Sequence, residues 1–262
     1  MAPSHVLITG ASSGIGEALA LQYAAPDVTL SLIGRDRERL AATAAGAHAK
    51  GSEVQVGLID VRDQAAMAKF IAAADASRPI DLAIANAGIT TGLAPDEFAE
   101  SPDAVRAIVS INLIGVFNTA EPLIAPMCMR KRGQIAFIGS IAGLRGLPYA
   151  PAYCATKAAV HAYSESLRGR LAGKGVEISL VIPGFVKTPL NDGISAIKPL
   201  EISAKEAAYL IKRGLDRHKA IIAFPKSLYW LARLSRILPI RLVDKVMAGF
   251  NVNIPRTHER IR

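Results

Sequence analysis

Seven short apolar runs alternate with longer alanine-rich segments along most of the chain. Most of these runs are continuously hydrophobic and rich in Val, Ile and Leu, which is typical of strands covered on both faces of a sheet. They are His5 to Thr9, Val28 to Ile33, Glu53 to Ile59, Asp81 to Ala85, Gln134 to Ile138, Val176 to Ile182 and Ala220 to Ala223. The alternation predicts an α/β fold, a doubly wound, mostly parallel seven-stranded sheet with helices on both faces.

The length and apolar content predict a single domain, since 262 residues of which 51% are hydrophobic can bury one large core. We expect the sheet domain to span residues 1–223, with a substrate loop at about 184–203. Residues 224–262 form a basic and apolar extension, which Pro239 divides into two short helices.

Charge is concentrated in this extension. The net charge is +9, and residues 219–262 contribute nine Lys or Arg against two acids. A basic tail without a reading motif argues against a nucleic-acid-binding domain. Three interpretations of the tail stay open: a cap over the active site, a subunit contact, or an amphipathic surface that rests on anionic lipid.

The two cysteines, Cys128 and Cys154, lack metal-like spacing, and no secretory leader precedes the first strand. No uninterrupted apolar stretch approaches the ~20 residues of a membrane-spanning helix. The five histidines are scattered along the chain, so we expect no metal site. These features predict a cytoplasmic protein, peripheral to the inner face of a membrane if the tail binds lipid.

A glycine-rich turn joins the first strand to a helical segment at Glu17 to Ala24. The turn reads Thr9-Gly10-Ala11-Ser12-Ser13-Gly14-Ile15-Gly16. Gly10 suits the turn, Gly14 allows backbone N–H groups to approach a pyrophosphate, and Gly16 allows close helix packing. Strand, glycine loop and helix together indicate a Rossmann-type dinucleotide site, and the missing Gly-Lys-Ser/Thr ending disfavours a P-loop.

Arg35 and Asp36 follow the second strand, where a dinucleotide enzyme distinguishes ribose hydroxyls from a 2′-phosphate. The Arg35 guanidinium can bind a phosphate with two hydrogen bonds, which favours NADP(H) over NAD(H). Two alternatives stay open: Arg35 is a solvated residue and Asp36 a helix cap, or Asp36 binds the ribose directly.

Tyr153 and Lys157 stand four residues apart in a segment predicted to be helical from about Ala152 to Leu171, so they share one helix face. A nearby ammonium favours the phenolate. Bringing a phenol to neutral pH requires about 4 kcal/mol, which one buried ammonium and the positive charge of a nicotinamide can provide together. Ser140 follows the fifth strand at the same sheet edge, where its hydroxyl can hold a substrate oxygen. Its surroundings do not match the Gly-Xaa-Ser-Xaa-Gly elbow of a hydrolase, and a plain cap at the strand end is the alternative.

Together these motifs resemble the short-chain dehydrogenase/reductase family in order and spacing, from residue 4 to about 223. The resemblance rests on Thr9 to Gly16, Asp60, Asn86-Ala87-Gly88, Asn112, Ser140, Tyr153 with Lys157, and Pro183-Gly184 with Thr188.

The resemblance implies a general acid and base at Tyr153, with Lys157 lowering its pKa and holding the nicotinamide ribose. It implies that Ser140 polarises the substrate carbonyl and that Asn112, on a long helix from Asp103 to Met129, holds a relay water. Asn112 taken alone is equally well a buried structural amide. The implied cofactor residues are Gly10, Ser12, Ser13, Gly14, Ile15, Gly16, Arg35, Asp60, Val61, Asn86, Ala87, Gly88, Tyr153, Lys157, Pro183, Gly184, Val186 and Thr188.

The predicted function is hydride transfer between NADP(H) and a ketone or secondary alcohol. The apolar residues of the segment after Gly184 favour a hydrophobic substrate, and the alternative is a lid that buries its own side chains. These residues are Phe185, Leu190, Ile194, Ile197 and Leu200. An NAD-dependent alcohol dehydrogenase and a non-catalytic dinucleotide-binding regulator remain alternatives. The long helices resemble those that pair subunits in the family, so we expect a homodimer or homotetramer.

Overall fold

The computed structural model describes residues 3–94, 97–191 and 198–248. Its main sheet contains β1 (His5–Thr9), β2 (Thr29–Gly34), β3 (Glu53–Leu58), β4 (Leu82–Ala85), β5 (Gly133–Ile138), β6 (Val176–Pro183) and β9 (Ile221–Phe224). The strands lie in the order β3-β2-β1-β4-β5-β6-β9, and every neighbouring pair is parallel. The predicted strands and the doubly wound parallel sheet are confirmed.

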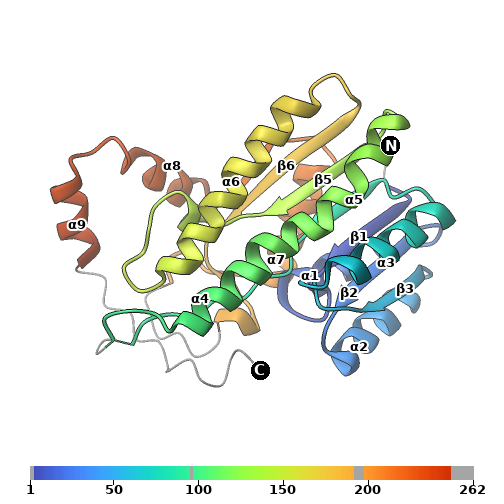
Figure 1. Ribbon diagram of the computed structural model, residues 1–262, viewed down its shortest axis with the longest axis horizontal. Helices are drawn as coiled ribbons and strands as arrows, with labels where there is room; N and C mark the ends of the chain where they lie inside the picture. Colours follow the sequence, from blue (N-terminus) through green and yellow to red (C-terminus); the bar gives the residue numbers. More distant parts are fainter. Residues whose placement is uncertain (1–2, 95–96, 192–197, 249–262) are drawn as a thin grey trace.

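Helices cover both faces of this sheet, and a separate apolar core lies beneath each layer (Figure 1). One layer consists of α1 (Gly14–Tyr23), α2 (Arg37–His48) and α7 (Ala204–Leu215). The other consists of α3 (Gln64–Ser77), α4 (Pro102–Val109), α5 (Gly115–Met129) and α6 (Pro151–Leu171). Asp36, Asp63 and Ser203 begin α2, α3 and α7 by accepting a hydrogen bond from a backbone N–H of the first turn.

The predicted long helix from Asp103 to Met129 is continuous but not uniformly α-helical. A π-helical turn, η1 (Ser110–Ile114), joins α4 to α5, and it contains Asn112. By length and hydropathy, Pro102–Met129 could cross a membrane, although polar residues interrupt its apolar sequence. Half of its most apolar window is buried in the protein, and Asn118 and Thr119 are among its buried residues, so here it is a core helix.

A second, two-stranded parallel sheet was not predicted. Strand β7 (Val186–Lys187) pairs with β8 (Ile202–Ser203), and the Ile202 N–H donates to the Phe185 carbonyl at 3.1 Å. These contacts bring together the two ends of the expected substrate loop. Residues 192–197 of that loop, including Ile194 and Ile197, lie outside the described residues.

The extension after β9 contains two short helices, α8 (Lys226–Leu234) and α9 (Ile240–Ala248). Pro239 lies between them, as predicted. Tyr229 of α8 is buried and joins the core beside α6. Figure 1 shows α8 and α9, in orange and red, at one end of the molecule beyond the sheet.

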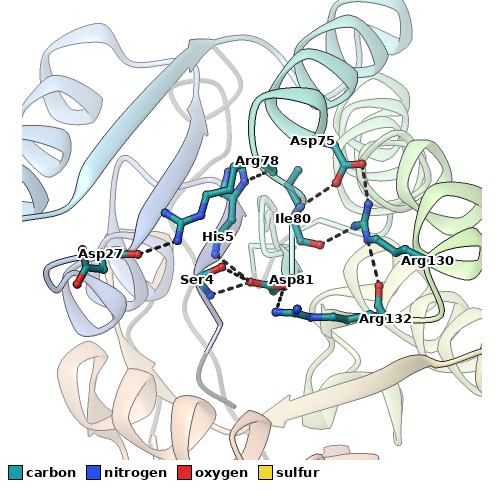
Figure 2. A network of polar contacts seen from close by, with 9 residues as sticks. All are labelled: Ser4, His5, Asp27, Asp75, Arg78, Ile80, Asp81, Arg130 and Arg132. Carbon is teal, nitrogen blue, oxygen red and sulfur yellow. Dashed lines mark hydrogen bonds and ion pairs between the residues drawn. The ribbon is translucent and has the colours of Figure 1, made fainter.

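A network of charged side chains lies at the amino ends of the strands (Figure 2). Asp81, just before β4, accepts hydrogen bonds from Ser4 N, Ser4 Oγ and His5 N, and pairs with Arg132 at 2.7 Å. Arg130 pairs with Asp75 at 2.7 Å and donates to the Ile80 carbonyl. These contacts join the start of β1 to the ends of α3 and α5, and they leave the opposite edge of the sheet for the site.

Candidate active site

Most of the predicted site residues follow the carboxyl ends of the strands, and the others come from two helical segments. Gly10 to Gly16 follow β1, Arg35 follows β2, Asp60 and Val61 follow β3, Asn86 to Gly88 follow β4, Ser140 follows β5, and Pro183 to Thr188 end or follow β6. Asn112 comes from the π turn, and Tyr153 and Lys157 come from α6. Parallel strands therefore bring segments far apart in sequence to one edge, where doubly wound folds bind ligands.

The backbone of the glycine loop is packed too closely for a side chain at Gly10 or Gly16. Gly10 has φ +66°, and a Cβ there would lie 2.8 Å from the Ala87 Cα. A Cβ on Gly16 would lie 2.1 Å from the Gly10 carbonyl oxygen, which confirms the close packing predicted for this glycine. The loop leads directly into the N-terminus of α1, whose free N–H groups and dipole favour an anion. This cradle fits the pyrophosphate of a dinucleotide.

Asn86 connects the glycine loop to β4. Its Nδ2 donates to the Thr9 carbonyl at 2.9 Å and to the Gly10 carbonyl at 3.3 Å, while Thr9 Oγ1 accepts from the Asn86 and Ala87 N–H groups. These hydrogen bonds hold two neighbouring strand ends in one arrangement. Asn86 thus shapes the floor of the site through the backbone of the loop.

Three charged residues meet where β2 and β3 end. Asp60 Oδ2 lies 2.6 Å from Arg62 Nη2 and 3.7 Å from Arg35 Nη1. The hydrogen bond from Arg62 holds the pKa of Asp60 below its ordinary value. Arg62 was not predicted, although its position two residues after Asp60 was a visible signal. The group has an excess of one positive charge, which suits a phosphate.

Asp36 is engaged elsewhere. Its carboxylate accepts from the Arg39 N–H at 3.0 Å and from Arg39 Nε at 2.7 Å, so it caps α2. The capping alternative is therefore right for Asp36. Arg35 is exposed, and its Nη1 lies 3.7 Å from Asp60 Oδ2.

Asn112 is completely buried and binds one backbone unit twice. Its Oδ1 accepts from the Ile89 N–H, and its Nδ2 donates to the Ile89 carbonyl, both at 2.8 Å. A Cβ on Gly88 would lie 3.3 Å from Asn112 Oδ1 and 3.7 Å from Lys157 Nζ. The amide thus holds the Gly88–Ile89 segment beside Lys157, which is the structural role that the sequence left open. The relay water stays a prediction.

Lys157 and Tyr153 lie on the same face of α6, as their spacing predicted. Lys157 Nζ is 5.7 Å from the centre of the Tyr153 ring and donates to the Ile138 carbonyl at 2.8 Å. Ser140 caps η2 (Ile141–Gly143) by accepting from the Ala142 N–H, and its side chain is hydrogen-bonded with Tyr153. A hydroxyl, a phenol and an ammonium therefore converge at one point.

Burial perturbs the pKa values of both ionisable groups here. It raises the pKa of Tyr153 to about 12, against a smaller lowering by the hydrogen bond with Ser140. It lowers the pKa of Lys157 to about 8. The protein by itself therefore does not produce the lowered phenol pKa that we expected, because desolvation of the phenolate is the largest cause of the shift and Lys157 Nζ lies 5.7 Å from the ring centre.

The segment after β6 returns to the glycine loop. A Cβ on Gly14 would lie 3.2 Å from the Thr188 Cβ, so Thr188 faces the start of α1. Val186 is buried, while Phe185 and Leu190 are partly exposed and Leu200 is exposed. The described part of the substrate loop therefore presents apolar surface near the site.

His161 is a second residue that sequence reasoning did not assign to the site. Its Nε2 accepts from the Ser140 N–H at 3.4 Å, and Cβ atoms on Gly139 or Gly143 would lie within 3 Å of its ring. Burial, followed by the charges of Lys157 and Arg236, lowers the pKa of His161 to about 4. A neutral His161 thus supports the Ser140 loop, and its position four residues after Lys157 on one helix face could have indicated this.

The geometry joins an anion cradle to a proton donor. In the described part of the chain, no group of three or more His, Cys, Asp or Glu side chains could hold a metal ion. A phenol hydrogen-bonded with a serine can hold and protonate a carbonyl oxygen, and the glycine loop can hold a dinucleotide within reach.

Comparisons with known proteins identify similar oxidoreductases. The family model described as short chain dehydrogenase matches residues 4–198. An uncharacterized oxidoreductase of Myxococcus xanthus is 36% identical over 239 residues, covering 91% of this chain and 94% of that protein.

Two solved structures have the same fold over nearly the full length. A short-chain dehydrogenase from Sphingobium yanoikuyae in complex with NADPH has a TM-score of 0.78 at 26% identity, covering 98% of this chain and 99% of that one. A short-chain dehydrogenase/reductase from Burkholderia phymatum in complex with NAD has a TM-score of 0.79 at 25% identity, covering 97% of each.

Proposed function

Because this chain belongs to the short-chain dehydrogenase/reductase family of oxidoreductases, we propose that it transfers a hydride between NADP(H) and a hydrophobic ketone or secondary alcohol. The observation that carries this proposal is the convergence of Ser140, Tyr153 and Lys157 beside the glycine loop. Family membership supports the reaction class, CH–OH to C=O, whereas the cofactor preference and the substrate are proposed from individual residues.

The proposed roles follow from the contacts. When bound, the nicotinamide supplies or accepts the hydride. Tyr153 donates its phenolic proton to the carbonyl oxygen during reduction, and the Ser140 hydroxyl holds that oxygen in place. Lys157 holds the nicotinamide ribose and favours the phenolate that remains. Asn112 positions the Gly88–Ile89 backbone beneath Lys157 through its two hydrogen bonds.

The raised pKa of Tyr153 is compatible with this cycle. A protonated phenol is the form that reduction requires, and burial keeps Tyr153 protonated. Oxidation requires the phenolate, which needs a positive charge in addition to Lys157. An oxidised nicotinamide supplies such a charge when it is bound.

NADP(H) preference is proposed from the guanidinium groups at the ends of β2 and β3. Arg35 and Arg62 both contact Asp60, so one carboxylate faces two cations. Asp36 caps α2 and pairs with Arg39, which leaves it poorly placed to accept from ribose hydroxyls. The Sphingobium relative holds NADPH and the Burkholderia relative holds NAD, so the family alone does not decide the preference.

A hydrophobic substrate, a homo-oligomer and a cytoplasmic location complete the proposal. The apolar side chains of Phe185, Leu190 and Leu200 support the substrate class. Subunit pairing is proposed through α5 and α6, which present one side to the outside of the helix layer (Figure 1).

The cofactor assignment is tested by measuring the dissociation constants of NADPH and NADH by nicotinamide fluorescence. In the Arg35→Ala variant we expect NADPH to bind about 10- to 100-fold more weakly, with little change for NADH, because a charged hydrogen bond contributes about 1.5–3 kcal/mol. Arg106→Ala, on the exposed side of α4, is the matched control. Equal loss for both cofactors would contradict the 2′-phosphate contact, and tighter NADH binding by the wild type would favour an NAD-dependent alcohol dehydrogenase.

A further inference from the structure

Helices α8 and α9, with the turn between them, carry large apolar side chains that the protein does not bury. Ile237 is 80% exposed, Ile240 70% and Leu231 65%. Trp230, Leu234, Leu238 and Leu242 are also exposed. We call these seven residues the tail patch. Single exposed apolar residues are ordinary, but seven within thirteen consecutive positions mark an interaction surface.

The patch stays exposed although its helices are attached to the body. Tyr229 and Val243 are buried and anchor α8 and α9, so their neighbours face outward. Figure 1 shows both helices at the end of the molecule, away from the sheet. The anchoring makes the tail patch a fixed feature of the surface.

Basic side chains surround the tail patch. Residues 226–245 contain five Lys or Arg and one acid, Asp244, which pairs with Arg145 at 3.3 Å. The Arg233 guanidinium lies 5.8 Å from the Trp230 ring centre and donates to Tyr229 Oη at 2.9 Å. An apolar surface that combines Trp and Leu with flanking Lys and Arg has the composition of helices that lie at a bilayer interface.

We propose that the tail patch binds the surface of an anionic lipid bilayer. The apolar side chains would enter the headgroup boundary, and the basic side chains would face lipid phosphates. A second copy of this protein fits the tail patch poorly. A symmetric contact would bring the Lys and Arg residues of one subunit against the same positively charged residues of the other. Charge complementarity therefore favours an anionic bilayer as the partner.

Bilayer contact would place lipid beside the catalytic edge. An open groove of about 740 Å³ runs between the loop after Ser140, the first turns of α6, and the tail helices. Arg236 and Asp244 line it on one side, and Leu144 to Pro148 line it on the other. The patch and the loop that carries Ser140 thus lie at the same end of the molecule. The binding proposal itself does not depend on the catalytic assignment.

The proposal is tested by flotation of the full-length protein with vesicles. We expect binding to vesicles of equimolar phosphatidylcholine and phosphatidylglycerol, little binding to phosphatidylcholine alone, and weakening by added salt. The double variant Leu231→Ser/Leu234→Ser should bind at least about tenfold more weakly, and so should Arg241→Glu/Lys245→Glu. All four side chains are exposed, so the melting temperature should stay close to that of the wild type.

Matched variants elsewhere on the surface make the test specific. Phe98→Ser removes an exposed apolar side chain, and Arg170→Glu/Lys174→Glu reverses two exposed charges at the far end of α6 and just beyond it. Neither should change flotation. No flotation of the wild type, or equal loss in patch and control variants, would overturn the proposal. So would a wild-type oligomer that the leucine variant dissociates, since the patch would then be a subunit contact.

Discussion

At the amino edge of the sheet, Asp81 and Asp75 each face an arginine at 2.7 Å and accept backbone hydrogen bonds besides (Figure 2). At the carboxyl edge, the Lys157 ammonium donates to a neutral carbonyl, and Tyr153 is held as a neutral phenol with a raised pKa. The amino edge pairs its partly buried aspartates with arginines, whereas at the carboxyl edge burial shifts the pKa values of a phenol and an ammonium that face each other. Perturbed pKa values of this kind cluster at functional sites. We therefore expect substitutions at the amino edge to affect stability and substitutions at the carboxyl edge to affect activity.

The largest effect expected from this contrast is on catalysis. Tyr153→Phe should lower kcat/KM by about 10²- to 10⁴-fold, because it removes the proton donor and keeps the ring. NADPH affinity and the melting temperature should change little. Steady-state kinetics and fluorescence titration of the same preparation check this. If the Tyr153→Phe variant retained turnover, Tyr153 would not be the proton donor. If the wild type turned over none of the carbonyl compounds tested, a non-catalytic dinucleotide-binding regulator would be favoured.

The next effect is on stability at the opposite edge. Asp81→Ala should lower the free energy of unfolding by about 2–4 kcal/mol, because the Ser4 and His5 N–H groups and Arg132 lose their acceptor. As a control, Asp103→Ala removes the solvent-exposed partner of Arg106 and should change the free energy of unfolding by less than about 1 kcal/mol. Urea denaturation measures both. Similarly small changes in the two variants would contradict a stabilising role for the ion pairs at the amino edge.

The smallest expected effect concerns pH and His161. Its pKa is about 4 in the folded protein and about 6.5 when unfolded, so the unfolded state binds the extra proton between these values. The His161 contribution to stability is therefore present above pH 6.5 and is lost as the pH falls towards 4.

This contribution is about 1–3 kcal/mol once partial exposure is allowed for. The free energy of unfolding, measured by denaturation at several pH values in this range, should depend less steeply on pH for His161→Gln than for the wild type. His48→Gln, an exposed substitution, is the control. An unchanged slope for His161→Gln would show that His161 is already protonatable in the fold.

Much of the fold was predictable because its signals are local. Continuous Val, Ile and Leu runs mark buried parallel strands wherever they lie, and each predicted strand end agrees with the structure to within one residue. The β7–β8 pair was missed because two residues carry no periodicity. The π turn at Asn112 was missed because its apolar pattern resembles that of an α-helix.

The structure brings the predicted site residues together, whereas the contacts between them could not be predicted from the sequence. Gly16 signals close packing by itself, and Tyr153 with Lys157 follows from helical spacing. The two hydrogen bonds between Asn112 and Ile89 join positions 23 residues apart, and Arg35 pairs with Asp60 across two neighbouring strand ends. Such pairings depend on the register of the sheet, which no local pattern specifies.

The sequence by itself determined which chemical groups the chain carries and in which order: a glycine loop, then a serine, then a tyrosine and a lysine on one helix. Tertiary structure alone decided which charges are neutralised, which phenol is desolvated and which apolar residues of the tail stay in contact with water. The physical reason is that periodicity and spacing are properties of neighbouring residues. Burial and pairing depend on atoms brought together from distant segments, and these set the pKa values and the exposed surface.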